Sequence, residues 1–342
     1  MTRLRSYMGY HAESQRVGDI DPAHGMLEYL CNRFELNIEQ RYWLAFVYAL
    51  TYSGPSTFYV YNEFPDFENL DEGRLERWWL DRGRQEIICQ TDRRWVRSLN
   101  LFVPAVVSYR QWMTGMTQEA HFDSCIGALK TPEDRYDRLY HSAKDALHSF
   151  GQFALFLYLE ALHTITPLEL EPTTLNLNTA TSCRNGLCYA YGMDKYLTEA
   201  GKPTPTGAHK DIAWAWWDLR RRLTSLPQRS TLWATETMLC AYKKYHRGKR
   251  YIGYYLDRQA VEIAKMEQSC PRGVAWEVLW QFRDETYLKE FRAETQDCVT
   301  HRGIKKRWRD DRTQYTGTIA GEVGTLGLIL GDGDETITTE GA

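Results

Sequence analysis

Apolar residues recur at helical spacing along most of this chain, whereas the apolar–polar alternation that marks half-buried strands is almost absent. The longest helical pattern covers residues 135–163, with Gly151 as an expected break, and a second covers residues 37–50. Further helices are expected at residues 58–61, 70–83, 91–114, 208–223, 231–245, 254–268 and 275–292. These patterns predict a mainly α fold in a single multi-helix domain.

The ends of the chain differ from its middle in composition. Residues 1–20 are polar and are expected to form an N-terminal arm, followed by a helical domain at residues 21–312. Residues 313–342 are predicted to be a flexible tail, because from Thr316 onward the chain is rich in Gly and Thr and has five acidic residues but no Lys or Arg. The whole chain has a net charge of -3, and removing the five negative charges of the tail leaves about +2. The net charge of the chain therefore does not indicate which kind of partner it binds.

Several classes of protein are excluded by what the sequence lacks. The N-terminus has no apolar run typical of a signal peptide, and no apolar span reaches about 18 residues, so we expect a cytoplasmic protein with reduced thiols. The cysteines form no C-x-x-C pair, and no His stands at zinc-ligand spacing beside Cys183 and Cys188, so no metal site is predicted. The signatures of P-loop kinases, dinucleotide-binding dehydrogenases, serine hydrolases and zinc peptidases are missing as well.

Basic residues are interleaved with aromatic ones in four clusters, at residues 93–97, 220–222, 242–251 and 302–309. Cations neutralise phosphates, and aromatic faces stack on unpaired bases. A solvated helix face would explain any one cluster, but four of them in a chain of near-zero net charge favour a polyanionic ligand. The cations expected to contact that ligand are Arg93, Arg94, Arg97, Arg247, Lys249, Arg250, Lys305 and Lys306.

The segment 236–244 combines side chains suited to chemistry. Helical spacing places Glu236, Cys240 and either Lys243 or Lys244 on one face. An acid and a cation on one face can serve proton transfer and phosphate binding together. Cys240 could act as a nucleophile, but its size and position favour a role in helix packing.

Two other segments offer polar groups, each with a simpler alternative. The loop expected at 182–194 contains Arg184 and Asn185 beside Gly186, groups that can hold an anion or a base edge, although a helix-capping loop would look the same. A Pro-containing turn at 61–68 carries Glu63 and Asp66, which could bind Mg²⁺ or act as a base, or could simply be solvated.

Taken together, five stretches of the chain resemble a phage family described as α-glutamyl/putrescinyl-thymine pyrophosphorylases and later as amino acid:DNA transferases. The stretches are residues 42–52, Tyr61-Asn62-Glu63-Phe64-Pro65-Asp66, Arg184-Asn185-Gly186-Leu187-Cys188-Tyr189-Ala190, 236–244 and 250–262. The resemblance extends over about residues 35–295 and would make 21–312 a catalytic domain. It also implies a relationship to helix-hairpin-helix DNA glycosylases, which agrees with the mainly α prediction.

The resemblance implies a reaction on hypermodified thymine in double-stranded phage DNA, in the cytoplasm of the host cell. Pyrophosphate leaves the 5-pyrophosphoryloxymethyl group of deoxyuridine, and an amino acid or polyamine attaches through its amine. Mg²⁺ could accompany the pyrophosphate, no other cofactor is expected, and other hypermodification enzymes are candidate partners. Two alternatives stay open: a non-catalytic DNA-binding relative of the helical domain of 5-hydroxymethyl-deoxyuridine DNA kinases, and a nucleotide or pyrophosphate hydrolase.

This chemistry assigns expected roles to the candidate residues. The base must leave the stack, the pyrophosphate needs cations, and the incoming amine needs a proton acceptor. We expect Arg184, Lys243, Lys244 and Arg258 to bind pyrophosphate, Asn185 to read the base, and Tyr254 and Tyr255 to stack or position it. Glu236 is the expected proton acceptor, with Glu63 and Asp66 as the next candidates.

Overall fold

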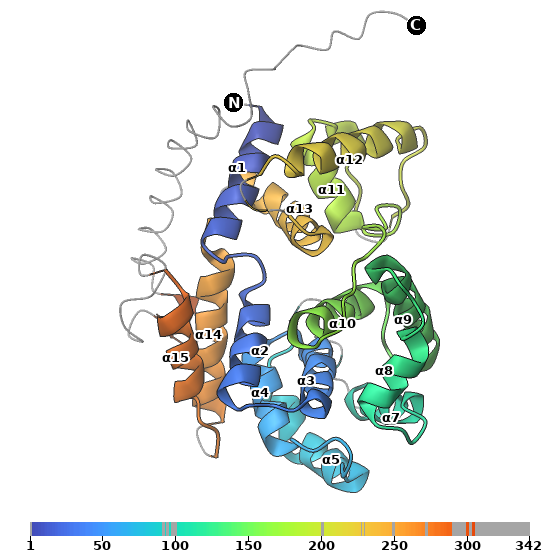
Figure 1. Cartoon of the computed structure of the whole chain (residues 1–342). Helices are drawn as coiled ribbons and strands as arrows, with labels where there is room; N and C mark the ends of the chain where they lie inside the picture. The colour runs from blue at the N-terminus through green and yellow to red at the C-terminus, as the bar shows by residue number, and fades with distance from the viewer. Residues whose placement is uncertain are drawn as a thin grey trace, which may run out of the picture. The chain divides into compact units, whose positions relative to one another are not determined.

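The computed structural model describes residues 2–90, 93, 96, 101–199, 202–226, 228, 230–247, 250–270, 273–288, 299–300 and 303–304. In this part of the chain the fold is mainly α-helical, as predicted (Figure 1). One antiparallel pair of two-residue strands, β1 (Val299–Thr300) and β2 (Gly303–Ile304), accompanies the helices, with Val299 opposite Ile304. The expected tail at 313–342 lies outside the described residues.

The helices belong to two compact units rather than to one. In its described part, unit 1 consists of Met1–Ile20 and Leu175–Tyr254, and unit 2 consists of Asp21–Thr174 and Tyr255–Lys305. The predicted boundary after residue 20 coincides with a boundary between the units, but the predicted domain 21–312 contains parts of both.

The described part of unit 1 is built from four α-helices and a short 3-10 helix: α1 (Arg3–Arg16), α11 (Thr181–Ala190), η3 (Asp194–Tyr196), α12 (His209–Leu223) and α13 (Leu232–His246). The polar arm expected at the N-terminus is instead helix α1, and it packs against α13. Tyr10 stacks on Tyr245 with ring centroids 4.0 Å apart, and the Tyr242 hydroxyl donates to the Arg3 carbonyl. Buried aromatic side chains, spaced along an otherwise polar segment, hold α1 in the unit.

Residues 182–190, expected to form part of a loop, lie in helix α11. This helix and α13 approach each other so closely that a Cβ atom added to Gly186 would lie 1.9 Å from the Leu239 carbonyl oxygen. Gly186 therefore allows α11 and α13 to pack closely and does not end the helix. The packing of the two helices overrides the low helix propensity of glycine.

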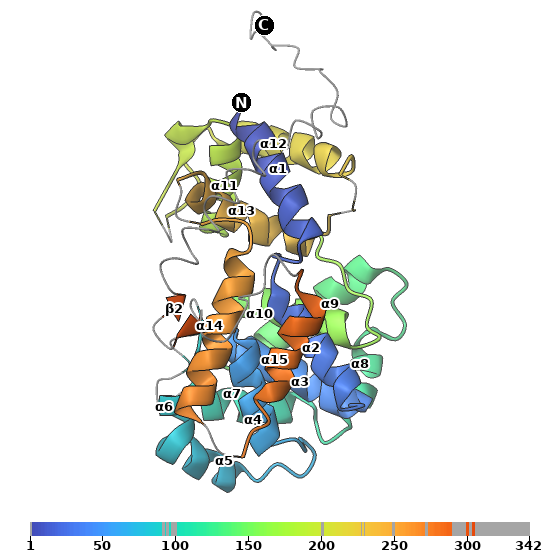
Figure 2. The ribbon, with the colours of Figure 1, turned by 90° about the vertical axis from the view of Figure 1, so that its left-hand side faces the viewer.

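Unit 2 contains the remaining helices: α2 (Pro22–Arg33), α3 (Ile38–Thr51), α4 (Gly54–Glu63), α5 (Glu72–Trp78), the π-helix η1 (Trp79–Gly83), α6 (Arg84–Glu86), α7 (Phe102–Trp112), α8 (Gln118–Ile126), α9 (Pro132–Ala146), α10 (Gln152–Ile165), α14 (Tyr254–Ser269, whose first residue is assigned to unit 1) and α15 (Glu277–Thr286). Helix α3 is buried in the core of this unit and packs against α10 and α4 (Figure 1). Helix α15 lies against α2 (Figure 2).

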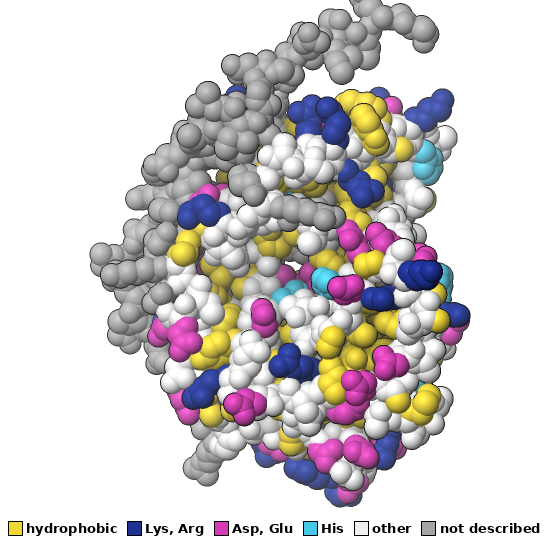
Figure 3. All heavy atoms as spheres, viewed as in Figure 1, with side chains coloured by type: hydrophobic (Ala, Val, Ile, Leu, Met, Phe, Trp, Pro, Cys, Tyr) yellow, Lys and Arg dark blue, Asp and Glu magenta, His cyan; other side chains and the backbone are white. Residues whose placement is uncertain are grey.

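The core of unit 2 is rich in aromatic rings, as the composition suggests. Phe46 of α3 stacks on Tyr109 of α7 with ring centroids 3.9 Å apart, and Phe150 and Tyr158 complete the group around Phe46. Dense aromatic packing of this kind fixes the helices that carry the pocket described below. On the face shown in Figure 3, acidic and basic side chains are interspersed over most of the surface, in keeping with the small net charge.

Candidate active site

A pocket opens in unit 2 where the start of α2, the end of α3 and one face of α14 meet. Its enclosed volume is only about 40 Å³, within an opening of about 360 Å³ that includes solvent. The lining residues are Asp21, Pro22, Ala23, Tyr48, Tyr52, Ser53, Tyr255, Arg258, Gln259 and Glu262. Two carboxylates, a guanidinium and three tyrosines thus border one pocket, and groups of these kinds can accept a proton, bind an anion and contact a planar ring.

Asp21 holds a strained backbone at the edge of this pocket. Its φ and ψ angles are 45° and 64°, the left-handed region, where residues other than Gly are uncommon. Asp21 stands at the N-cap of α2, yet its side chain makes no capping hydrogen bond. The carboxylate instead accepts hydrogen bonds from Tyr48 at 3.2 Å and Tyr52 at 3.4 Å. Strained residues cluster at functional sites, although five other non-glycine residues of the described chain also have a positive φ.

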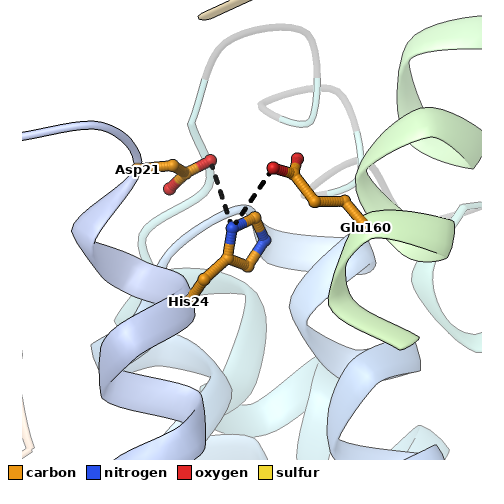
Figure 4. Close-up of side chains that lie close together, drawn as sticks. All are labelled: Asp21, His24 and Glu160. Carbon is orange, nitrogen blue, oxygen red and sulfur yellow. Dashed lines mark ion pairs between the residues drawn. The ribbon is translucent and has the colours of Figure 1, made fainter. Parts of the chain in front are cut away.

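The His24 ring lies between the carboxylates of Asp21 and Glu160 (Figure 4). The Nδ1 atom of His24 is 4.0 Å from an Asp21 carboxylate oxygen and 3.5 Å from one of Glu160, which reaches in from α10. Burial lowers the pKa of His24, and the nearby Asp21 carboxylate only partly opposes this, so the imidazole is neutral near pH 7.

The same three residues could hold a metal ion, since their ligand atoms lie within 4.8 Å of one another and all three residues are buried. One nitrogen and two carboxylates suit a cation such as Mn²⁺ or Zn²⁺ better than Mg²⁺, which prefers oxygen. The cluster equally suits a hydrogen-bonding network that supports Asp21.

Across the pocket, Arg258 and Glu262 are neighbours on α14. The Arg258 Nε atom is 3.1 Å from Glu262, and the guanidinium also donates to Gln90. Glu262 accepts a further hydrogen bond from Ser53 at 2.9 Å. Burial raises the pKa of Glu262, although the Arg258 charge opposes this. About a quarter of the Arg258 side chain is exposed, 26%, so this held cation faces the pocket.

Arg184 lies elsewhere, fully buried in unit 1 with 0% exposure. Its guanidinium donates to the carbonyls of Leu177, Asn178 and Lys202 and to the hydroxyls of Thr198 and Thr204. These bonds tie the segments on either side of α11 to the helix. The geometry argues for a structural cation in place of the expected pyrophosphate ligand.

Asn185 also has its groups engaged within unit 1. Its side-chain amide donates to the Thr198 carbonyl at 2.6 Å, and its side-chain oxygen accepts from the Thr198 amide at 3.0 Å. Both groups with which it was expected to read a base edge therefore hold a loop, so a base-reading role would require this loop to move.

Glu236 and Cys240 share one face of α13, as predicted from their spacing. Cys240 donates to the Glu236 carboxylate at 3.0 Å. A hydrogen bond with Cys183 and burial raise the pKa of Cys240 well above its ordinary value, so the thiol stays protonated, which suits the packing role and not a nucleophile. Lys243 and Lys244, in the last turn of α13, lie in unit 1 too.

Of the tyrosines and the cation on α14, Tyr255 and Arg258 line the pocket of unit 2, whereas Tyr254 lies beneath the Arg250 guanidinium in unit 1.

The carboxylates of the 61–68 turn make local interactions. Glu63 pairs with Arg82 at 3.2 Å. Asp66 accepts hydrogen bonds from Asn69, and these lower its pKa.

The cations expected to bind DNA have mixed positions. Arg93 is buried, with 4% exposure, and donates to the Ser149 carbonyl, so it is not a surface contact. Arg247 lies over the Tyr189 ring and Arg250 over the Tyr254 ring. Arg94, Arg97, Lys249, Lys305 and Lys306 lie outside the described residues.

The sequence analysis did not select Asp21, His24 or Glu160. The Asp21-Pro22 pair reads as an ordinary helix start, and a lone His or Glu on an apolar helix reads as a core residue. A His and an Asp three residues apart at a helix start was the available signal, but it is common and does not identify a site.

Comparison with known proteins identifies the family of this chain. The sequence profile of the amino acid:DNA transferase family matches residues 15–251, and the chain belongs to this family. A serinyltransferase of Salmonella phage ViI is 26% identical over 264 residues, which cover 72% of this chain and 63% of the relative. The chain thus matches less than two thirds of that relative's length.

No solved structure matches the chain, so the expected relationship to helix-hairpin-helix glycosylases stays a prediction. Among the described helices, none is both long and apolar enough to cross a membrane.

Proposed function

We propose that this protein attaches an amino acid to a modified thymine base in DNA and that the pocket of unit 2 is its active site. The juxtaposition of Asp21 with Arg258 in one pocket, in a chain of the amino acid:DNA transferase family, carries this proposal. The substrate is DNA containing 5-pyrophosphoryloxymethyl-deoxyuridine, in the cytoplasm of a phage-infected cell. The donor is an amino acid, with a polyamine as the alternative.

In the proposed step, the amine nitrogen of the donor forms a bond to the 5-methylene carbon of the base. The bond from this carbon to the pyrophosphate oxygen breaks, and the pyrophosphate leaves with the electron pair. Arg258 stabilises the charge that develops on the leaving group. Asp21 accepts the proton released by the amine, with His24 and Glu160 fixing its position. Tyr52 and Tyr255 provide aromatic surface for the base.

The substitution Asp21→Asn tests this assignment, because Asn keeps the shape of the side chain and tolerates the left-handed backbone. Loss of a general base typically lowers turnover by about 10²–10⁴-fold. Asp66→Asn is the matched control, since Asp66 is exposed and accepts hydrogen bonds from Asn69 in its own turn. Glu236→Gln examines the carboxylate preferred from the sequence. The readout is mass spectrometry of nucleosides after incubation of modified DNA with pooled amino acids.

We expect Asp21→Asn to lose most turnover while Asp66→Asn and Glu236→Gln retain it. Full activity in Asp21→Asn, or selective loss in Glu236→Gln, would move the base away from this pocket. Release of pyrophosphate from the free modified nucleotide as fast as from DNA would favour the hydrolase alternative. DNA binding without release of pyrophosphate would favour the non-catalytic relative.

A further inference from the structure

Helix α12 carries an unusual set of exposed side chains. Of the large hydrophobic side chains exposed in the described part of the chain, Trp217 at 62% and Trp214 at 52% are the most exposed. Tryptophan is normally largely buried, and exposed aromatic side chains grouped together mark interaction sites. Both indoles project from one helix, in a protein whose proposed substrate is a nucleic acid.

The tryptophans are part of a stripe that includes cations. Lys210, Trp214, Trp217 and Arg221 follow at intervals of four, three and four residues, which places them on one face of α12. This stripe is about 16 Å long at 1.5 Å per residue. In the view of Figure 3, hydrophobic and cationic side chains lie together on the surface over α12.

The stripe is held in place by its neighbours. The Trp214 indole makes an edge-to-face contact with Tyr191, with ring centroids 5.8 Å apart. Arg221 lies 5.7 Å from the centre of the Trp217 ring and is bound at 2.9 Å by Asp218, which is buried. Exposed aromatic groups that are already ordered lose little conformational freedom when a ligand binds.

The charge of α12 is also suited to a polyanion. The helix has four cations (Lys210, Arg220, Arg221 and Arg222) against two carboxylates (Asp211 and Asp218). Burial opposes ionisation of Asp218, but hydrogen bonds from Arg222 and Arg221 outweigh it and hold the pKa of Asp218 below its ordinary value. One carboxylate thus serves two arginines, and the exposed end of α12 keeps a net positive charge.

We propose that the α12 face, defined by Lys210, Trp214, Trp217 and Arg221 with Arg220 at its edge, binds a DNA strand whose bases are unstacked. Trp214 and Trp217 stack on bases, and the cations contact the adjacent phosphates. The inference rests on the proposed function in taking DNA as the substrate. It adds a preference for unpaired bases, such as those next to a base that has left the stack.

The test compares two labelled DNA probes of the same sequence, one fully paired and one with a central unpaired bubble. Fluorescence anisotropy gives the Kd for the full-length protein at several salt concentrations. Trp217→Ala, together with the double variant Trp214→Ala/Trp217→Ala, removes the indoles, and Met116→Ala is the control for loss of an exposed apolar side chain. Arg220→Gln removes an exposed cation, with Arg138→Gln on α9 as its control.

We expect the double variant to weaken binding to the bubble probe by at least about tenfold, with a much smaller effect on the paired probe. Arg220→Gln should weaken binding to both probes and lower the salt slope by about 1. Trp217→Phe should retain more binding than Trp217→Ala, because a ring remains. Met116→Ala and Arg138→Gln should bind as the wild type does.

Unchanged binding of the tryptophan variants to the bubble probe would overturn the proposal. A change from oligomer to monomer in light scattering, with DNA binding unaffected, would show that the face joins copies of this chain and would overturn it too. The probes contain no modified base and no donor is added, so the outcome does not depend on turnover. Loss of the transferase reaction with the expected binding pattern would refute the proposed activity and leave the α12 face standing.

Discussion

At the scale of single residues, burial separates groups that hold the fold from groups that can meet a substrate. Arg184 and Arg258 are both arginines selected from the sequence, but Arg184 is fully buried and bound by carbonyl and hydroxyl oxygens whereas Arg258 borders a pocket. From residue type alone, both arginines were expected to bind the pyrophosphate anion. A guanidinium satisfied by backbone carbonyls is a structural cross-link, and removing it would leave buried acceptors without donors.

His24 provides a test of how Asp21 is supported. In His24→Gln we expect turnover to fall by about tenfold, less than the 10²–10⁴-fold loss expected for the base itself, with KM little changed. Without the imidazole, the Asp21 and Glu160 carboxylates lose the group that lies between them, so Asp21 is positioned less firmly. Steady-state kinetics that separate kcat from KM measure this loss.

The same variant examines whether the cluster holds a metal ion. After chelation, we expect activity of the wild type and of His24→Gln to return at the same Mg²⁺ concentration, because the cation enters with the pyrophosphate. A higher Mg²⁺ or Mn²⁺ requirement in His24→Gln would show that the imidazole is a metal ligand. A matching loss of thermal stability on chelation, absent from the variant, would support that conclusion.

We expect His11 to make the stability of unit 1 dependent on pH. Burial lowers the pKa of His11 from 6.5 to about 3, and its ring nitrogens interact with Tyr7 and Ser230. The unfolded chain takes up a proton below pH 6.5, but the folded chain does not until about pH 3. The free energy of unfolding should therefore fall as the pH drops below 6.5, by about 1.4 kcal/mol per pH unit from this group.

Denaturant titrations between pH 7.5 and pH 5 measure this dependence. His11→Gln should be less stable than the wild type at pH 7.5, since Gln replaces a ring buried between two partners. Its stability should vary less with pH, so the two proteins converge as the pH falls. Parallel pH profiles for the two proteins would mean that His11 is not the group responsible.

At the scale of secondary-structure elements, local signals predicted the helices well where sequence neighbours determine them. Asn37 and Gln40 form a capping box at the start of α3, and Gly151 stands at the N-cap between α9 and α10, close to where both were expected. The prediction of a loop at 182–194 was wrong for the residues that form α11. Gly186 is needed there because it packs against the Leu239 backbone of α13, which is remote in sequence. The pocket was missed for the same reason: Asp21 precedes α2, Tyr48 lies on α3 and Arg258 lies on α14, and only tertiary packing brings such groups together.

Gly186→Ala measures the close contact between α11 and α13. Helix propensity alone favours Ala over Gly by about 1 kcal/mol. The added Cβ would lie 1.9 Å from the Leu239 carbonyl oxygen, however, so backbone must shift. We expect a net loss of about 2 kcal/mol or more in the free energy of unfolding. Gly151→Ala is the control, because nothing lies within 4 Å of its added Cβ, and an effect as large there would disprove the steric explanation.

At the scale of the whole molecule, the described part of unit 1 is formed by two segments that are far apart in the sequence. Residues up to Ile20 and residues from Leu175 to Tyr254 contribute to the same unit, with most of unit 2 inserted between them. The sequence placed a boundary at residue 20 from composition but gave no sign that the two segments pack together. Contacts such as that between Tyr10 and Tyr245 connect residues far apart in the chain, and apolar periodicity carries no information about such pairing.

Deletion of residues 2–16 should accordingly destabilise unit 1 selectively. Loss of α1 uncovers Tyr242 and Tyr245 on α13, so amide hydrogens in α11 and α13 should exchange faster. Those in α3 and α10 of unit 2 should keep most of their protection. Hydrogen exchange with mass spectrometry resolves these helices, and Tyr10→Ser offers a milder form of the same change. Unaltered exchange in α13 would mean that the N-terminal segment is dispensable, as its polar composition first indicated.

The left-handed backbone at position 21 also limits how this family can diverge. Gly, Asn and Asp adopt such a conformation most readily, so the backbone disfavours other residues there before any chemistry is considered. A descendant that loses the carboxylate while keeping the fold is expected to carry Asn or Gly at this position. If Asp21 is the proposed base, the residue found there would distinguish working transferases from relatives that have kept the fold and lost the reaction.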